Sequence, residues 1–261
     1  MPAGRLRLED MTQPSPPARP QPRPDSEVER ALVVVAHPDD ADFGAAGTIA
    51  SWTDAGIEVT LLLCTRGEQG GFDDTPRDQI PALREAEQRA ASGVVGVTDV
   101  RFLEGHSDGW LEPGWELQRQ IVRVIRAVRP QRVLIQSPER WYDRLQASHP
   151  DHLAAGEAAI RAVYPAARNP FAFPELLADE GLEPWTVREV WIMAHPGVDH
   201  FVEITDTFDR KLAALHAHRS QTEHMGEKLP EMIRGWGTMV AERAGLPEGR
   251  LAEAFKVIAT G

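Results

Sequence analysis

The sequence predicts an α/β domain, a three-layer sandwich in which helices cover both faces of a mostly parallel sheet. Two observations predict this fold. Short apolar runs alternate with longer segments of helical periodicity along most of the chain, an order typical of strand–helix–strand units. The first run, ALVVVA at Ala31–Ala36, contains no polar residue, as expected for a strand that is buried on both faces. We expect right-handed crossovers between successive strands.

The elements follow in order along the chain. The four leading strands are expected at Ala31–Ala36, Ile57–Cys64, Val100–Leu103 and Arg132–Gln136. The helices after them are expected at Ala45–Ala55, Pro81–Val95, Trp115–Val128 and Asp151–Val163. Two later strands are expected at Val187–Met193 and Phe201–Ile204, and helices at Phe208–His218 and Leu229–Ala244 are expected to close the chain.

The first residues differ in composition from the rest. Pro14–Pro24 alternates proline with polar and basic residues, and it offers nothing that could form a core. We therefore interpret residues 1–28 as a disordered Pro-rich tail. No obvious linker divides residues 29–261, which we expect to form a single domain.

Charge and cysteine content exclude several function classes. The net charge of −12 over 261 residues argues against a surface for nucleic acid or anionic membranes, since both need clustered Lys and Arg. The single cysteine, Cys64, allows no intrachain disulfide. The longest apolar run, Ile57–Cys64, is too short to span a bilayer. Met1–Asp10 carries charges and no hydrophobic stretch, so we expect a cytoplasmic protein without membrane insertion.

Two polar clusters follow strands of the expected sheet. His37-Pro38-Asp39-Asp40-Ala41-Asp42 comes directly after the first strand, and Ser148-His149-Pro150-Asp151-His152 comes after the fourth. In open α/β sheets, ligands bind at the carboxyl ends of the strands. Zinc accepts imidazole nitrogen and carboxylate oxygen, and a catalytic site commonly uses three such ligands with one open position. Two ligands from the first loop and one from the second complete that set.

A structural alternative accounts for the same carboxylates. Asp is common at helix starts, where its side chain caps exposed backbone N–H groups. Asp39, Asp40, Asp42 and Asp151 all stand where a helix is expected to begin. Matched clusters after two strands favour the metal site over four separate caps, because both the type and the number of ligands fit.

An apolar strand that runs into Ala36-His37-Pro38-Asp39-Asp40, followed later by His149-Pro150-Asp151-His152, resembles the LmbE-like or PIG-L family. That family includes N-acetylglucosaminyl-phosphatidylinositol de-N-acetylases and the deacetylase of mycothiol synthesis. Gly67-Glu68, the Arg84–Glu87 segment and the Lys211–Gln221 segment support the resemblance, which covers roughly residues 31–225.

The resemblance implies roles for individual positions. The implied metal ligands are His37, Asp40 and His152; Asp39 matches the general base; His149 matches the residue that faces the developing oxyanion; and Asp151 stands where it can orient a histidine. In the mycothiol branch, residues similar to Glu68, Arg84 and Asp108 hold the sugar.

The implied protein is a Rossmann-like, metal-dependent amidohydrolase that acts on linear amides. It removes an N-acyl group, most simply acetyl, from a small amino-sugar substrate. The resemblance implies Zn²⁺, although a nitrogen and oxygen ligand set also accepts another divalent ion such as Fe²⁺. It is also compatible with a homo-oligomer. One alternative is an amidase for a thiol conjugate, which uses the same centre. Another is a non-catalytic nucleotide- or ligand-binding module. The first strand–helix turn lacks the G-x-G-x-x-G motif of dinucleotide-binding folds, which argues against this module.

Overall fold

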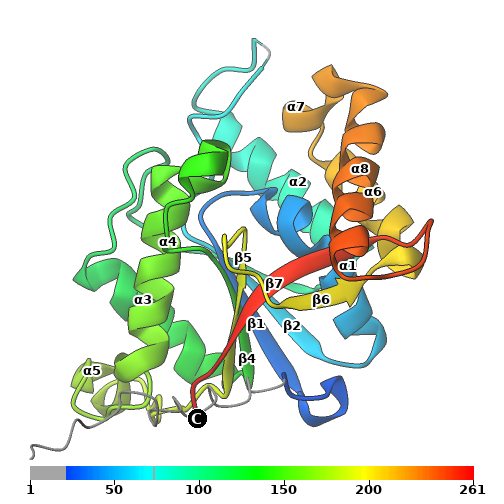
Figure 1. Ribbon diagram of the computed structural model, residues 1–261. Coiled ribbons are helices and arrows are strands. Elements are labelled where there is room, and N and C mark those ends of the chain that lie inside the picture. The colour runs from blue at the N-terminus through cyan, green and yellow to red at the C-terminus, as the bar shows by residue number, and fades with distance from the viewer. Residues whose placement is uncertain (1–21, 73) are drawn as a thin grey trace, which may run out of the picture.

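The computed structural model describes residues 22–72 and 74–261. A seven-stranded sheet in the order β3-β2-β1-β4-β5-β7-β6 forms the middle layer, and helices cover both of its faces (Figure 1). The strands are β1 (Arg30–Val35), β2 (Glu58–Leu63), β3 (Asp99–Phe102), β4 (Arg132–Gln136), β5 (Glu189–Met193), β6 (His200–Glu203) and β7 (Ala252–Ala259). The predicted α/β sandwich with a mostly parallel sheet is confirmed.

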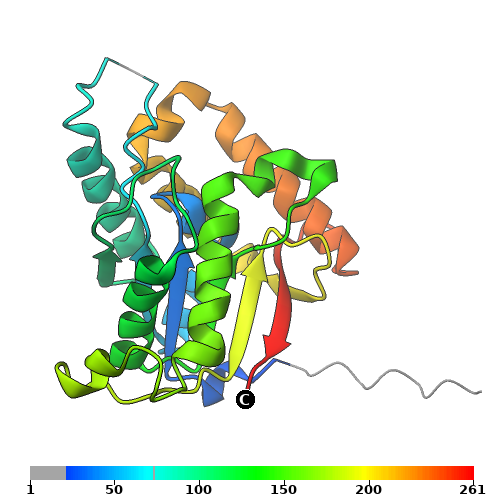
Figure 2. The same cartoon turned by 90° about the vertical axis from the view of Figure 1, so that its left-hand side faces the viewer.

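The helices fall into two groups around the sheet. The α-helices are α1 (Asp40–Asp54), α2 (Ile80–Val94), α3 (Trp115–Val128), α4 (Pro150–Arg161), α5 (Pro174–Ala178), α6 (Phe208–Ala217), α7 (Arg219–Thr222) and α8 (Lys228–Arg243). Helices α3 and α4 lie on one side of the sheet, and α1, α2 and α6 lie on the other (Figures 1 and 2). Short 3-10 and π turns join several of them: η2 (Asp25–Glu27), η3 (Tyr142–Ser148), η4 (Ala162–Ala166), η5 (Thr205–Thr207) and η6 (Glu223–Met225).

The central strand β1 explains why the sheet has two separate cores. It pairs in parallel with β2 and β4, so that Val34 lies opposite Leu62 and Ile135. Successive side chains of a strand point to opposite faces. Accordingly, Val34 packs into the core beneath α3 and α4, whereas Val33 packs into the core beneath α1, α2 and α6. Both valines are fully buried, which is why this strand is apolar from its second residue to its end.

Helix α1 begins earlier than the sequence pattern indicates. We predicted a start near Ala45, but the helix begins at Asp40. The second half of the polar cluster after β1, residues 40–42, therefore lies in the first turn of the helix, and His37, Pro38 and Asp39 precede it. The expected strand Arg132–Gln136 and the expected helix Trp115–Val128 have the predicted bounds.

The end of the chain corrects one prediction. We expected helices to close the chain, but the last element is strand β7, which lies antiparallel between β5 and β6. The strand was not predicted because Glu253 and Lys256 interrupt its apolar residues. Glu253 on this strand is buried and accepts a hydrogen bond from Lys211 Nζ at 2.6 Å, and Phe255 is fully buried.

Part of the predicted tail packs against the sheet. Residues 1–21 lie outside the described part of the chain. Within residues 22–28, the Arg132 guanidinium donates to Asp25 Oδ1 at 2.6 Å and to the carbonyl of Arg23 at 2.9 Å, and Val28 is buried. This segment differs from a disordered tail because the fully buried Arg132 needs anionic and carbonyl partners.

In the described ranges, no helix is both long enough and apolar enough to cross a membrane.

Candidate metal and catalytic site

The two polar clusters meet at the carboxyl edge of β1 and β4. Asp40 lies between two histidines from the two loops: its Oδ1 is 2.9 Å from His152 Nε2, and its Oδ2 is 3.4 Å from His37 Nδ1. The rings of His37 and His152 are 5.3 Å apart between centroids. The first turns of α1 and α4, the helices after these strands, carry Asp40 and His152. Three expected ligands thus lie in mutual contact.

The donor chemistry of this cluster fits a divalent cation. Ligand atoms of His37, His149 and His152 lie within 4.8 Å of one another. Burial alone would raise the pKa of the Asp40 carboxyl, but His152 and His37 hold that pKa well below its ordinary value. An ionised carboxylate beside two imidazoles is a ligand set that zinc and related ions accept. Asp40 touches both His37 and His152, which favours it as the third ligand.

His37 points its second nitrogen at two carboxylates. Its Nε2 lies 2.9 Å from Asp108 Oδ1 and 3.0 Å from Asp151 Oδ2. Asp151 also accepts the backbone N–H groups of Gly109 at 2.7 Å and Leu111 at 3.2 Å. Burial lowers the pKa of His37, but hydrogen bonds with Asp108, Asp151 and Asp40 outweigh it and raise the pKa to about 12. Nε2 thus donates to Asp108 and Asp151 while Nδ1 faces Asp40, and an ion held on the Nδ1 side would have to displace the proton that Nδ1 carries in the imidazolium.

The Asp39 side chain does not cap helix α1. Asp39 occupies the N-cap position with a left-handed backbone, φ 82° and ψ −22°, and makes no side-chain cap hydrogen bond. Its carboxylate instead lies 3.0 Å from Arg84 Nη2. Burial raises the pKa of the Asp39 carboxyl to about 6, against the opposing effect of Arg84. The structural alternative therefore fails for this residue, and its pKa suits proton transfer near neutral pH.

His149 is the residue that caps helix α4. Its Nδ1 accepts the backbone N–H of Asp151 at 3.2 Å, so the neutral ring carries its proton on Nε2. Burial lowers the pKa of His149, and the neighbouring His37 and His152 lower it further. Its ring centroid lies 5.2 Å from that of His152. A neutral His149 is thus still able to donate a hydrogen bond.

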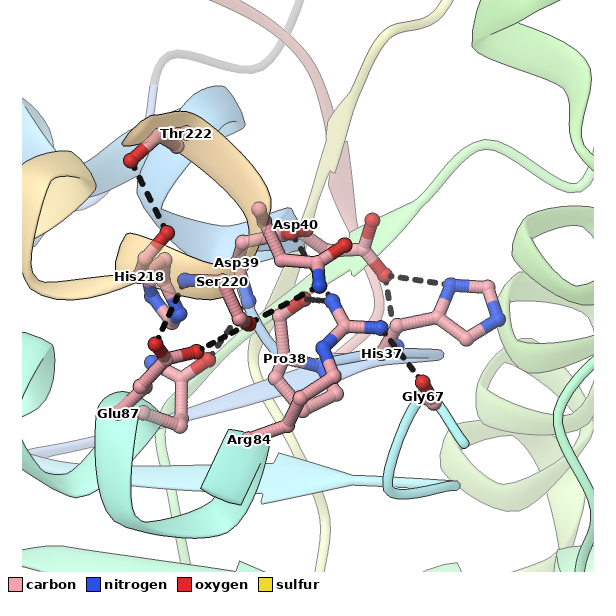
Figure 3. A network of polar contacts seen from close by, with 12 residues as sticks. His37, Pro38, Asp39, Asp40, Gly67, Arg84, Glu87, His218, Ser220 and Thr222 are labelled. Carbon is pink, nitrogen blue, oxygen red and sulfur yellow. Dashed lines mark hydrogen bonds and ion pairs between the residues drawn. The ribbon is translucent and has the colours of Figure 1, made fainter. Parts of the chain in front are cut away.

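The three residues expected to hold a sugar are engaged with the protein. Glu68 Oε1 accepts the backbone N–H of Asp108 at 2.8 Å, and Asp108 Oδ2 accepts that of Gln69 at 2.9 Å. Arg84 is 4% exposed and donates to the carbonyl oxygens of Gly67 and Pro38 (Figure 3). These contacts join the loops after β2 and β3 to the loop after β1.

A buried polar network behind Asp39 was not anticipated from the sequence. Gln88 on α2 accepts the Asp39 N–H at 2.8 Å and donates to Asp42 Oδ2 at 2.9 Å. Asp42 Oδ2 also forms a hydrogen bond with His218 Nε2 at 2.9 Å. Only the resemblance of the flanking segments pointed to this region, since a lone glutamine in a helix carries no signal of its own.

A neighbouring pair of hydrogen bonds connects the start of α7 to α2. Glu87 accepts the backbone N–H of Ser220 at 2.8 Å and its hydroxyl at 2.7 Å (Figure 3). These bonds hold the start of α7 against α2.

Comparison with known proteins identifies the family of this chain. Residues 32–163 match PIG-L, described as GlcNAc-PI de-N-acetylase. The chain belongs to the PIG-L family. The matched range runs from within β1 to just beyond α4, and so contains both polar clusters.

Several proteins that this chain resembles are deacetylases. The chain is 36% identical over 199 residues to the diacetylchitobiose deacetylase of Thermococcus kodakarensis, a match that covers 76% of this chain and 72% of that protein. It is 30% identical over 244 residues to the 1D-myo-inositol 2-acetamido-2-deoxy-alpha-D-glucopyranoside deacetylase of Rhodococcus erythropolis, covering 74% and 81%. The structure of the N,N'-diacetylchitobiose deacetylase from Pyrococcus horikoshii superposes with a TM-score of 0.81 at 28% identity, covering 90% of this chain and 85% of that one. These matches support N-deacetylation of amino-sugar substrates.

Proposed function

We propose that this chain is a zinc-dependent hydrolase that removes an N-acetyl group from a small molecule containing an amino sugar. The observation that carries the proposal is the position of Asp40, in contact with His37 and His152, with the uncapped Asp39 carboxylate next to it in the chain. Three protein ligands with an open position, and a separate base, are the parts that metal-assisted amide hydrolysis commonly uses.

His37, Asp40 and His152 would hold the ion. When bound, the ion supplies a Lewis acid that polarises the amide carbonyl and makes water more acidic. Asp151 accepts the Nε2–H of His37 and fixes its orientation. Zinc and Fe²⁺ both suit this donor set.

Asp39 takes one proton from the attacking water as the oxygen bonds to the carbonyl carbon. The tetrahedral oxyanion receives a hydrogen bond from His149, whose Nδ1 is held by the Asp151 N–H. Asp39 then passes the proton to the nitrogen as the C–N bond breaks. The products are acetate and the free amine. Glu68 and Asp108, which bind one another beside His37, are proposed to receive the hydroxyls of the sugar.

An assay of purified protein tests this function. The protein is loaded with zinc and incubated with N-acetylglucosamine, N,N'-diacetylchitobiose and N-acetylglucosaminyl-inositol, and the free amine and acetate are measured by mass spectrometry. We expect equal amounts of amine and acetate, and loss of both after chelation. Metal-loaded protein that releases neither from any substrate would contradict the proposal. Release of an amine only from thiol conjugates would favour the amidase, and binding of a dinucleotide without metal would favour the ligand-binding module.

A further inference from the structure

Helix α2 places two polar side chains one turn apart against the same residue. Arg84 and Gln88 are four positions apart, so they share one face of the helix. Arg84 Nη2 lies 3.0 Å from Asp39 Oδ2, and Gln88 Oε1 accepts the Asp39 N–H at 2.8 Å. One side chain therefore contacts the carboxylate of Asp39, and the other contacts its backbone.

The backbone of Asp39 needs such support. A φ of 82° lies in the left-handed region, which residues with a Cβ adopt rarely and keep only when their surroundings hold them there. The Asp39 side chain makes no cap bond of its own. The contact with Gln88 satisfies its N–H and keeps the residue in this conformation.

The amide of Gln88 can face only one way. Gln88 is fully buried, and its Nε2 donates to Asp42 Oδ2 at 2.9 Å and to Ser92 Oγ at 3.3 Å. An amide nitrogen donates and a carboxylate accepts, so the contact with Asp42 fixes the nitrogen on that side. The carbonyl oxygen of Gln88 is thereby directed at the Asp39 N–H.

Arg84 is enclosed by the loop after β2. A Cβ added at Gly67 would lie 2.0 Å from Arg84 Nη1, and one added at Gly70 would lie 2.7 Å from it. Both glycines let the backbone close over the guanidinium, and Figure 3 shows the Gly67 carbonyl beside it. Its two terminal nitrogens bond the carbonyls of Gly67 and Pro38 as well as Asp39. Arg84 is thus directed at the residues that precede α1, not at a sugar beyond them.

We propose that Gln88 and Arg84 are positioning residues that hold Asp39, through its backbone and its carboxylate, at the angle from which it exchanges a proton. The inference rests on the base role proposed above for Asp39. It replaces the sugar contact that the family resemblance implies for Arg84. A displacement of about 1 Å in a reacting group is enough to cost about 100-fold in rate.

Gln88→Met tests the backbone contact. Methionine keeps the volume of glutamine but removes its hydrogen bonds. We expect kcat to fall about 10- to 100-fold, with KM and bound metal per chain unchanged, and the Asp39 amide to exchange its hydrogen faster by NMR. Ser92→Ala is the matched control, because it removes a contact of Gln88 on the same helix and leaves the Asp39 contact in place. A Gln88→Met variant that keeps wild-type kcat and Asp39 exchange overturns the proposal.

Gln88→Glu separates the contact with Asp39 from the contact with Asp42. A carboxylate still accepts the Asp39 N–H but repels Asp42. If positioning of Asp39 is what matters, kcat stays closer to wild type than in Gln88→Met, and this variant also serves if Gln88→Met does not fold. Equal loss in both would assign the effect to Asp42 and overturn the backbone role.

Arg84→Met tests the carboxylate contact with paired substrates, an N-acetyl amino sugar and its deoxy analogues. A positioning role predicts the same fractional loss of kcat on every analogue. A sugar contact predicts that the variant loses the preference for one hydroxyl, and that result overturns our assignment. Should wild-type protein deacetylate none of these substrates, the proposed function fails, while the exchange of the Asp39 amide still reports whether Gln88 holds it.

Discussion

Asp151 shows how much a single carboxylate does at this site. It accepts hydrogen bonds from His37 Nε2 and from the N–H groups of Gly109 and Leu111, and its own N–H is accepted by His149. It therefore orients an expected ligand and the expected oxyanion donor together, while it holds the loop after β3. The sequence placed it near the histidines but did not show which one it binds.

Replacement of Asp151 should weaken metal binding without abolishing it. In Asp151→Asn, the ionised acceptor for the His37 N–H is lost, and we expect affinity for zinc to fall about 10- to 100-fold. Competition with a fluorescent chelator measures this change. Asp143→Asn, on the exposed η3 segment, is the control, and equal affinity in the two variants would contradict the orienting role.

Substitutions at Asp39 and His37 should distinguish a loss of turnover from a loss of bound metal. Asp39→Ala is expected to keep its metal and to lose about 100- to 10,000-fold in kcat, the range for a lost general base. His37→Ala is expected to lose both metal and activity. Elemental analysis alongside the assay measures each quantity. Near wild-type turnover in Asp39→Ala would show that the base lies elsewhere.

At the scale of single elements, a glycine lets helix α4 pack closely against strand β4. Gly156 on α4 lies against the end of β4: a Cβ added there would lie 2.4 Å from the carbonyl oxygen of Gln136. This contact lets α4, which carries His152 in its first turn, lie directly over the strand that precedes it.

We expect Gly156→Ala to destabilise the fold by about 1–3 kcal/mol, because the added methyl group meets backbone that cannot move aside. The matched control is Gly235→Ala in α8, where nothing lies within 4 Å of the added Cβ. That change should be neutral or stabilising by up to about 1 kcal/mol, as alanine favours helix. Urea unfolding of both variants measures the difference, and equal effects would contradict the packing argument.

At the amino ends of β4 and β5, far from the metal site, the two strands share a buried ion pair. Arg132 is fully buried, donates to Glu189 Oε1 at 2.6 Å and lies over the rings of both Trp52 and Trp191, which contact one another. Removal of Glu189 leaves the buried Arg132 charge with only the partly exposed Asp25 as a carboxylate partner, so we expect Glu189→Ala to cost up to about 3–5 kcal/mol. The free energy of unfolding tests this. A loss no larger than that of the exposed Glu180→Ala would show that the pair is not needed.

For the whole molecule, a bound ion should raise stability, because its ligands come from segments more than a hundred residues apart. Binding to the folded state alone contributes about 2.7 kcal/mol at a free-metal concentration 100 times Kd. We expect chelation to lower the Tm of the wild type and to leave that of His152→Ala unchanged. Calorimetry measures both, and an equal Tm shift in the two proteins would exclude a site that uses His152.

Stability should also depend on pH through His218. Burial lowers the pKa of this histidine, but hydrogen bonding to Asp42 outweighs it and raises the pKa above the ordinary value. A raised pKa in the folded state contributes stability that is fully present below the unfolded value of about 6.5 and is lost as pH rises through the folded value.

His218→Gln removes that contribution. We expect its free energy of unfolding to change less than that of the wild type as pH rises from about 6 upward. His216→Gln, exposed on α6, is the control and should follow the wild type. A His218→Gln curve parallel to the wild type would contradict the ion pair with Asp42.

Local patterns were enough for much of this molecule. Apolar runs such as Ala31–Ala36 predict buried strands because a strand inside a parallel sheet has no solvent face. The residue types of the two polar clusters predict a metal site, since imidazole and carboxylate groups after parallel strands converge at one edge. Those inferences need only neighbours in the chain and one rule of topology.

Which strands pair, and which side chains form hydrogen bonds, was in contrast decided by packing between segments far apart in the sequence. Strand β7 pairs with β5 only after the chain has returned past α8, and no local pattern encodes that position. The partner of Asp151, the direction of Arg84 and the hold of Gln88 on Asp39 depend on which helices lie side by side. A hydrogen bond requires atoms within about 3 Å, and only the folded chain brings these atoms that close.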